Sequence, residues 1–258
     1  EVVADTEVVA DTEVVADTAE ETEVEDTLPV EEDMEEEVIE PFLALQDGDG
    51  EGGINWAVDK WFDGEWDDWV ATYGSIENWN TSEVTDMSTL FMAKDISGLD
   101  LSSWNVGSVT NMYRMFRSTS GNLQGDISEW DTSNVESFYE MFQNATEFNK
   151  DLTYWDVSSA INISFMFKDA TAFNGNIVNW ETVEATNMQA MFEGATTFNQ
   201  NISDWNTSNV TTMTRMFRYA SNFNQDLTAW EVDNLEAFWG SRFFADDSGL
   251  DENFYPPF

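Results

Sequence analysis

The chain has 258 residues, with 52 acidic and 9 basic side chains, no histidine, no cysteine and a net charge of −43. Such a surface repels nucleic acid and anionic lipid headgroups, which excludes nucleic acid as a partner. Without cysteine and histidine, the usual zinc sites, thiol nucleophiles and an imidazole general base are excluded too. No apolar run approaches the roughly 18 residues of a membrane-spanning helix, so membrane insertion is not expected.

Residues 1–41 are predicted to be an acidic N-terminal arm. The arm opens with three copies of the hexapeptide EVVADT, and its first forty residues hold eighteen carboxylates and no basic residue. Most acidic tracts of this kind are disordered spacers. The even period, however, presents the same faces of every copy in an extended strand, so addition to a sheet edge of a neighbouring subunit is the alternative. Its candidate interface residues are Val2, Val8 and Val14.

An Asp-Gly loop follows the arm and resembles a calcium-binding loop of the EF-hand kind. Asp47, Asp49 and Glu51 alternate as oxygen ligands would, and a glycine stands where such a loop turns sharply. The bidentate glutamate is missing, because Val58 takes its place and Asp59 comes one residue late. The sequence therefore predicts a Ca²⁺ site of non-standard form, with a metal-free Asp-Gly turn as the alternative.

Residues 42–75 as a whole are predicted to cap the next part of the chain. Four tryptophans are expected to cover its first coil, because an uncapped stack of repeats exposes its core. These are Trp56, Trp61, Trp66 and Trp69.

Residues 76–240 repeat one sequence pattern. Tryptophan recurs every 25 residues, once after 26, at positions 79, 104, 130, 155, 180, 205 and 230. A period of this length is typical of a solenoid in which each coil contacts only its neighbours.

Each repeat divides into two halves by its apolar spacing. Apolar residues at 5, 8, 11 and 12 places after the tryptophan have the spacing of a short helix or 3-10 turn. A Phe-Asn pair and a Leu or Ile then precede the next tryptophan, as in a short strand. We therefore expect an α/β repeat solenoid of the leucine-rich-repeat kind, with one parallel strand and one short helix per coil. The Trp, Met and Phe columns are expected in the core, and the asparagines in a hydrogen-bonded ladder.

The last coil departs from this pattern. Arg242 falls where the repeat expects phenylalanine, and Phe243 follows it. Residues 241–258 are therefore predicted to form a C-terminal cap.

The repeats resemble those of the BspA-like leucine-rich-repeat surface proteins. The resemblance covers roughly residues 76–240 and rests on runs such as MFQNATEFNKDLTYW and MFRYASNFNQDLTAW. It implies a secreted or surface-exposed protein that acts in adhesion and binds proteins or cells. No catalytic residues come with it.

A row of Asp and Asn residues stands four places before each tryptophan. Stacked coils would bring like charges within about 5 Å of one another. The row is therefore expected to be solvated, or else to bind cations. Its members are Asp100, Asp126, Asp151, Asn176, Asn201 and Asp226.

Basic residues gather near the Met-Phe pairs. Arg114 and Arg117 occupy the same places in their repeat as Arg215 and Arg218 do in theirs. They are candidate partners for the carboxylates of an acidic arm from another copy, which would give a head-to-tail homo-oligomer. Local salt bridges within one chain are the alternative.

Together these features predict a non-enzymatic, extracellular or cell-surface protein. It would act in adhesion or as a structural subunit of a surface or filament assembly, with other copies of itself or with surface or matrix proteins as partners. The alternative is a monomeric, calcium-dependent module that binds protein or glycan. Enzymatic activity is not expected, because no pair of carboxylates stands out with the differing environments that acid–base catalysis requires.

Overall fold

A computed structural model describes residues 44–64, 73–236 and 244–258, all within one compact unit, Pro41–Phe258. No helix in these ranges is long and apolar enough to cross a membrane. Several residues singled out above lie outside the described ranges: Val2, Val8, Val14, Trp66, Trp69, Arg242 and Phe243.

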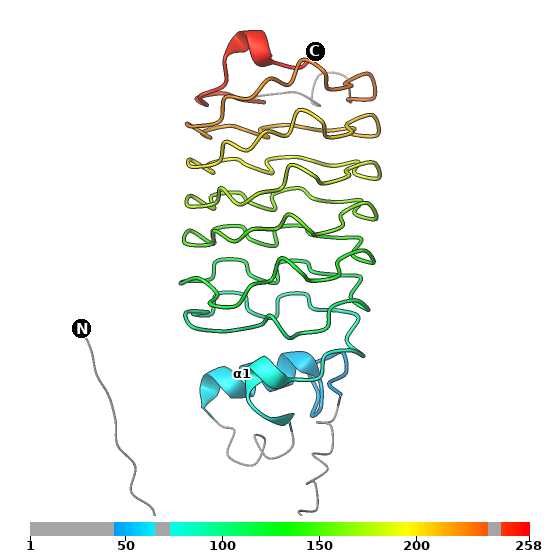
Figure 1. The fold of residues 1–258 in the computed structure, drawn as a ribbon, viewed down its shortest axis with the longest axis vertical. Helices are drawn as coiled ribbons and strands as arrows, with labels where there is room; N and C mark the ends of the chain where they lie inside the picture. The colour runs from blue at the N-terminus through cyan, green and yellow to red at the C-terminus, as the bar shows by residue number, and fades with distance from the viewer. Residues whose placement is uncertain (1–43, 65–72, 237–243) are drawn as a thin grey trace, which may run out of the picture. The chain divides into compact units, whose positions relative to one another are not determined.

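The repeats form coils that stack along one axis, and each coil begins at one of the tryptophans (Figure 1). Helix α1 (Ile54–Asp63) lies at the N-terminal end of the stack, followed by the 3-10 turn η1 (Ile76–Asn78). A second 3-10 turn, η2 (Glu252–Phe254), lies in the last coil. Coils 1 to 7 comprise residues 79–103, 104–129, 130–154, 155–179, 180–204, 205–229 and 230–258.

The tryptophans form one buried column through the stack. The Trp130 and Trp155 rings stack with their centroids 6.1 Å apart, and the Trp180 and Trp205 rings lie 5.9 Å apart. From Trp104 on, each indole N–H also donates to a carbonyl 28 or 29 residues earlier in the chain, as from Trp180 Nε1 to Leu152 O at 3.0 Å. The column therefore satisfies its polar atoms while it fills the core.

Phenylalanines stack beside the tryptophans. The Phe116, Phe142 and Phe167 rings follow one another at centroid distances of 5.4 and 5.5 Å, almost parallel. The methionines next to them are also fully buried. The prediction that these columns form the core is confirmed.

The asparagine ladder is confirmed as well. Asn149 Oδ1 accepts the backbone N–H of Asn174 at 2.9 Å, and Asn174 Oδ1 accepts that of Asn199 at 2.9 Å. The ladder continues through Asn224 to the backbone N–H of Asp251. A side-chain oxygen thus links each of these coils to the next at the same bend.

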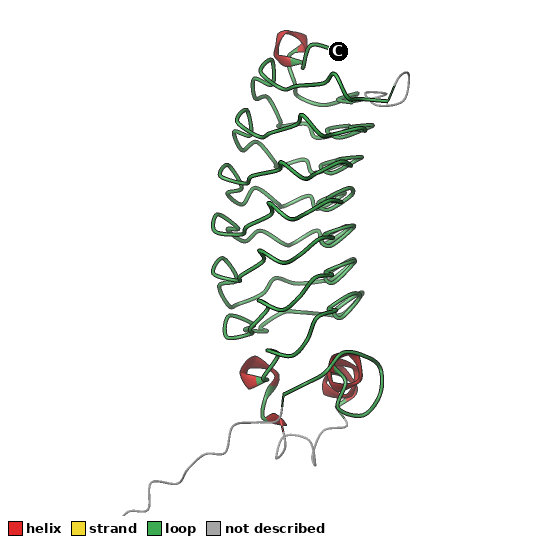
Figure 2. Cartoon of the chain, turned by 90° about the vertical axis from the view of Figure 1, so that its right-hand side faces the viewer, coloured by secondary structure: helices red, strands yellow, loops and turns green. Residues whose placement is uncertain are grey.

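The predicted fold class is wrong. Coils 1 to 6 contain no helix, and their β-pairing is confined to isolated parallel bridges. Figure 2 shows the coils as turns and loops without a strand. The bridges between coils, such as Asp86 with Asn111 and Asn111 with Ser137, fall mostly in the half that was expected to be helical. The chain is therefore not an α/β solenoid of the leucine-rich-repeat kind.

Left-handed residues explain why no helix forms there. Arg114 and Ser118, at 10 and 14 places after Trp104, have φ of 55° and 57°, which ends any right-handed helix. Backbone N–H groups donate to the next coil instead of to the residue four places back, as from Phe91 N to Met115 O at 2.8 Å. The apolar spacing of three to four residues therefore reflects consecutive turns.

The N-terminal cap is built around α1. Ile54, Ala57 and Val58 are buried on one side of the helix, and Gly64 ends it in the left-handed conformation. The expectation for Trp61 is confirmed, since its ring meets Trp79 edge-on at 6.1 Å. The cap therefore closes the tryptophan column at this end.

The last coil carries three extra residues. Phe217 N donates to Phe244 O at 2.8 Å, the bond that Phe192 N makes to Met216 O. Phe244 therefore stands where a methionine is expected, 27 residues after Phe217 rather than 24. The sequence alignment that placed Arg242 in the phenylalanine column is wrong, because the insertion shifts the register.

We predict that Trp180→Phe destabilises the stack by at least about 1 kcal/mol, since it removes the buried indole hydrogen bond and some ring volume. The shift of the urea midpoint, followed by circular dichroism, measures the loss of stability. Tyr154→Phe, at an exposed ring, is the matched control and should leave the midpoint unchanged. An equal midpoint for Trp180→Phe would show that the indole hydrogen bonds contribute nothing.

Candidate binding face

Four places in each coil differ in residue type from coil to coil. They lie 9, 10, 13 and 14 places after the tryptophan and flank the Met-Phe pair, which keeps its residue types in coils 2 to 6. We call them the variable face. In coils 1 to 6 they are Ser88-Thr89 with Met92-Ala93, Tyr113-Arg114 with Arg117-Ser118, Tyr139-Glu140 with Gln143-Asn144, Ser164-Phe165 with Lys168-Asp169, Gln189-Ala190 with Glu193-Gly194, and Thr214-Arg215 with Arg218-Tyr219.

Half of these places have a strained backbone. The residues at places 10 and 14 have φ between 51° and 72°, and Gly194 is the one glycine among the twelve. Glycine adopts this conformation at little cost, whereas a residue with a side chain pays roughly 1–2 kcal/mol. Phe165 and Tyr219, which are bulky, are especially unusual there. Strain of this kind gathers at functional sites, so the variable face is the candidate site.

A buried carboxylate organises the face in coils 2 and 3. Glu140, with a side chain only 8% exposed, lies 2.7 Å from Arg114 Nε and 3.2 Å from Arg117 Nε. Arg114 also lies over the Tyr113 ring, 4.5 Å from its centroid, and the Tyr113 and Tyr139 rings stack at 5.3 Å. The ion pair and the rings together fix the direction of Arg114, and Arg117 is held by its ion pair with Glu140 and by its hydrogen bond to Gln143 Oε1 at 2.9 Å.

Glu193 plays the same part in coils 4 to 6. Its side chain is 7% exposed and receives Lys168 Nζ at 2.8 Å from the coil before and Arg218 Nη1 at 3.8 Å from the coil after. Arg218 in turn lies over the Tyr219 ring at 4.4 Å. Each buried carboxylate is therefore the counter-charge of basic residues from neighbouring coils.

The protonation of Glu140 follows from these contacts. Burial raises its pKa, but hydrogen bonds from Arg114 and Tyr139 and the charges of both arginines outweigh burial and hold the pKa below its ordinary value. The same hydrogen bond raises the pKa of Arg114. Glu140 is therefore an anion at neutral pH.

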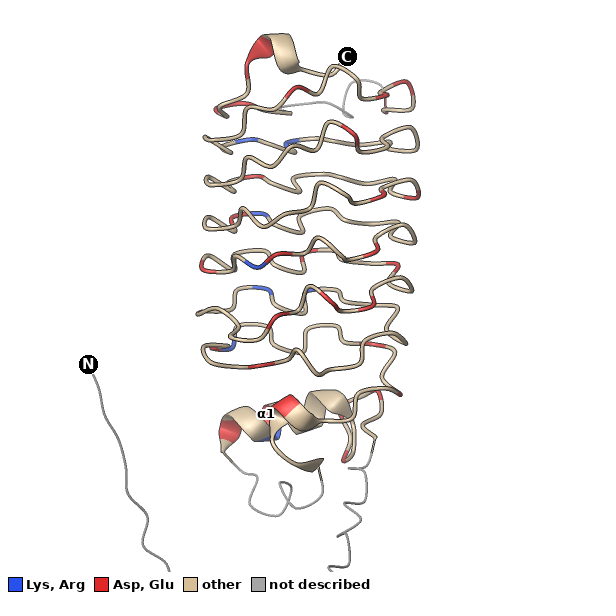
Figure 3. Cartoon of the chain, viewed as in Figure 1, with Lys and Arg blue, Asp and Glu red and all other residues tan. Residues whose placement is uncertain are grey.

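The face holds most of the basic residues of this acidic chain. Six of the nine lie 10 to 15 places after the tryptophan of coil 1, 2, 4 or 6, and Figure 3 shows the Lys and Arg residues of the stack in blue. Places 9 to 15 of coils 1 to 6 contain only three carboxylates, those of Glu140, Asp169 and Glu193. The six basic residues are Lys94, Arg114, Arg117, Lys168, Arg215 and Arg218.

The structure thus brings the four predicted interface arginines to one face. Arg114, Arg117 and Arg218 take part in ion pairs between coils, the alternative that the sequence left open. Arg215 is exposed on the same face. The sequence did not reveal Glu140 and Glu193 as their counter-charges, although their spacing of 25 or 26 residues from Arg114 and Lys168 was a usable signal.

The predicted calcium ligands have other roles. Asp47 Oδ1 accepts the backbone N–H groups of Thr85 and Asp86 at 2.8 and 2.9 Å, and its Oδ2 accepts the Thr85 hydroxyl at 2.5 Å. Asp59 forms an ion pair with Lys94 at 2.8 Å. Asp47 and Asp49 line a polar hollow beside coil 1. Within the described ranges, no group of three or more such side chains is arranged to hold a metal. The Ca²⁺ site stays a prediction.

The Asp and Asn row forms local turns. Asp100 Oδ1 accepts the backbone N–H of Ser102 at 3.0 Å, and Asn176 Oδ1 accepts that of Val178 at 3.2 Å. Hydrogen bonds from neighbouring Ser or Thr residues lower the pKa of Asp100, Asp126 and Asp226. One acceptor oxygen suffices for this role, so Asp and Asn alternate freely.

One family of known proteins matches the chain. Its description is "Mycoplasma protein of unknown function, DUF285", and its sequence model matches residues 58–178 and 152–253. The chain belongs to this repeat family. The two matches run from within α1 into coil 7 and thus include the whole variable face. No curated protein and no solved structure matches the chain significantly.

We predict that Glu140→Gln destabilises the protein by about 1–3 kcal/mol at pH 7, because it leaves two arginines without their counter-charge. The folded pKa of Glu140 lies below the unfolded one. Its contribution is therefore complete above the unfolded value, about 4.3, and is lost as the pH falls through the folded value. Urea midpoints of both proteins between pH 7 and pH 3 should converge at the acid end.

The matched control is Glu136→Gln. Glu136 is exposed and has no ion pair in the part of the chain that the structure describes. Its substitution should leave the midpoint nearly unchanged at every pH. If the difference between the urea midpoints of the wild type and Glu140→Gln stayed constant down to pH 3, the carboxylate charge would not be what stabilises the fold.

Proposed function

We propose that this chain is a non-enzymatic binding scaffold of the cell surface or extracellular space, which acts in adhesion to other proteins through its variable face. The observation that carries the proposal is the backbone strain at places 10 and 14, where eleven of twelve residues in coils 1 to 6 keep a side chain. A fold that needed only the backbone conformation would favour glycine at these places.

The composition of the face supports the same reading. Tyr and Arg are the residues that most often dominate binding energy at protein interfaces. Tyr113, Arg114 and Arg117 lie together in coil 2, and Arg218 and Tyr219 in coil 6. Because Glu140 and Glu193 fix several of these side chains before binding, less conformational entropy is lost when a partner docks.

The location and the adhesive role rest on the resemblance to the BspA-like surface proteins. The description of the repeat family to which the chain belongs names no function. The argument for the location and the adhesive role therefore comes from the resemblance and not from the family. A binding scaffold also agrees with a core filled by stacked Trp, Phe and Met side chains. Most side chains of the variable face are partly or fully exposed.

A panel of immobilised matrix and cell-surface proteins tests the proposal. The double variant Tyr113→Ser and Arg117→Gln uses residues that other coils carry at the same places, namely Ser88 and Gln143. It should bind the captured partner at least about tenfold more weakly, which corresponds to the loss of one or two hot-spot residues. Surface plasmon resonance measures the affinity, with Thr228→Ser as a control outside the face.

Two results would contradict the proposal: no protein of the panel binds the wild type, or the double variant binds as well as the wild type does. Repeating the measurement with EGTA tests the alternative of a calcium-dependent module that binds protein or glycan. Loss of binding in EGTA would favour that alternative.

We further propose that the acidic arm of one copy docks on the basic residues of another, which would assemble copies head to tail. The first forty residues carry eighteen carboxylates, and the variable face carries most of the Lys and Arg residues. Charge complementarity between these two regions of separate copies supports the idea. The ion pairs to Glu140 and Glu193 would compete with it.

Deletion of residues 1–40 tests the assembly. The full chain should form particles larger than a monomer in light scattering and negative-stain microscopy, and the deletion should yield monomers. The effect should weaken in high salt, because it depends on charge. Equal particle sizes before and after deletion would exclude this role of the arm.

A further inference from the structure

Three exposed apolar side chains lie in successive coils. Tyr154, Ile161 and Val183 are 68%, 48% and 36% exposed. They belong to coils 3, 4 and 5, at the turns on either side of the tryptophan column. We call them the apolar patch, and none of them belongs to the variable face.

The fold does not require apolar residues at these places. In the other coils the place of Tyr154 holds Ser, Glu, Asn, Asp or Ala, and that of Ile161 holds Thr or Glu. The place of Val183 holds Ser, Gly or Asp. Every coil folds around the same core, so apolar residues here serve something outside the fold.

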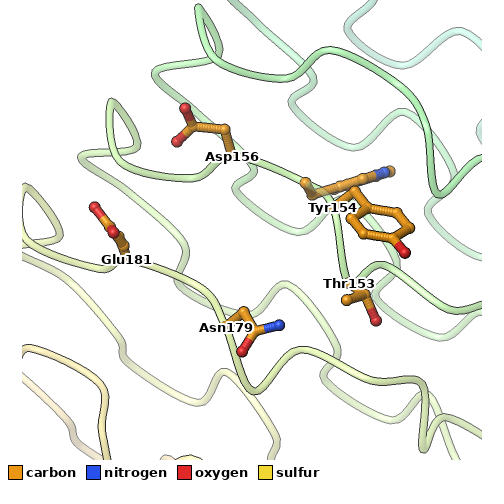
Figure 4. Close-up of a pocket in the computed structure, with 6 residues that line it drawn as sticks. Thr153, Tyr154, Asp156, Asn179 and Glu181 are labelled. Carbon is orange, nitrogen blue, oxygen red and sulfur yellow. The ribbon is translucent and has the colours of Figure 1, made fainter.

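A hollow of about 270 Å³ is lined by Tyr154 and by residues of coils 3, 4 and 5. Figure 4 shows Asp156 and Glu181 extending to the same side of their coils, with Tyr154 and Asn179 at the other end of the hollow. Trp155, which is almost completely buried, contributes to its wall. A protruding aromatic ring beside a shallow hollow offers a side chain of a partner a place to anchor.

The charge around the patch is negative. Asp156, Glu181 and Glu184 are exposed, and Glu136 precedes Ile161 by one coil. None of these four forms an ion pair with another residue in the described ranges. The carboxylates near the patch therefore have no basic partner in the described part of the chain.

We propose that the apolar patch docks a basic polypeptide segment with an apolar anchor residue. The anchor packs against Tyr154 in the hollow, and flanking Lys or Arg side chains pair with Asp156 and Glu181, which line the same hollow. An acidic partner would be repelled by the same carboxylates, and a purely apolar one would leave them without partners. The variable face, with its basic residues, takes a partner of the opposite kind.

The probe is the peptide Lys-Lys-Leu-Lys-Lys-Leu-Lys-Lys, acetylated and amidated, with a second peptide in which serine replaces both leucines. The full chain is compared with the triple variant Tyr154→Ser, Ile161→Thr and Val183→Ser, which uses residues that other coils carry there. Titration calorimetry at about 0.15 M and about 0.5 M salt separates screened charge attraction from the apolar anchor.

The wild type should bind the leucine peptide at least about tenfold more tightly than the triple variant does, which corresponds to the loss of an apolar anchor. That ratio should persist at the higher salt concentration, and the serine peptide should not distinguish the two proteins. Thr228→Ser, outside both the variable face and the apolar patch, should bind as the wild type does.

Three results would overturn the proposal. Equal affinity of the triple variant and the wild type would show that only general acidity attracts the peptide. Equal affinity of the wild type for both peptides would show that no apolar anchor exists. Absence of binding to either peptide would show that the patch does not recognise basic segments. Circular dichroism of the triple variant confirms its fold in each case.

Discussion

The structure depends on how each coil forms the hydrogen bonds of its backbone N–H and C=O groups without forming a regular strand. N–H groups at every second residue from place 8 to place 14 donate to carbonyls of the following coil, as from Thr89 N to Tyr113 O at 2.8 Å. The chain points these N–H groups toward the following coil because the residues at places 10 and 14 adopt the left-handed conformation. The turns point the side chains of the Met-Phe pair into the core, and they place the residues on either side of the pair at the variable face. One hydrogen-bonding requirement thus creates both the core and the variable face.

The charges of the face follow from this arrangement. A side chain at place 10 or 13 lies next to its counterparts in the coils before and after, so that an acidic residue can meet basic ones from neighbouring coils. Glu193 meets basic residues of the coils before and after it, Glu140 meets two arginines of the coil before it, and both carboxylates are nearly buried. Guanidinium groups held by a carboxylate and by an aromatic ring are presented in a fixed direction, which suits recognition better than freely rotating side chains do.

The sequence predicted what depends on period and on single residue types: the length of a coil, the buried Trp, Met and Phe columns and the asparagine ladder. It could not predict the local conformation, since a spacing of 8, 11 and 12 is shared by a helix and by a run of turns with left-handed residues. Asp47 was also beyond it, because the partners of its carboxylate, Thr85 and Asp86, lie 38 and 39 residues away. In the last coil the insertion makes an alignment by a constant period wrong. The backbone hydrogen bonds from Phe217 to Phe244 and from Tyr219 to Asp246 give the register.

The direction of the hydrogen bonds between coils bears on how such a chain can change over time. At the variable face each coil is held by backbone atoms of its neighbours, which every residue except proline can supply on both sides. A whole 25-residue unit can therefore be duplicated, lost or exchanged without disturbing the bonds of the units beside it. The exposed side chains of a unit are then exchanged together with it. Different surfaces can arise when units are rearranged, while the core stays the same.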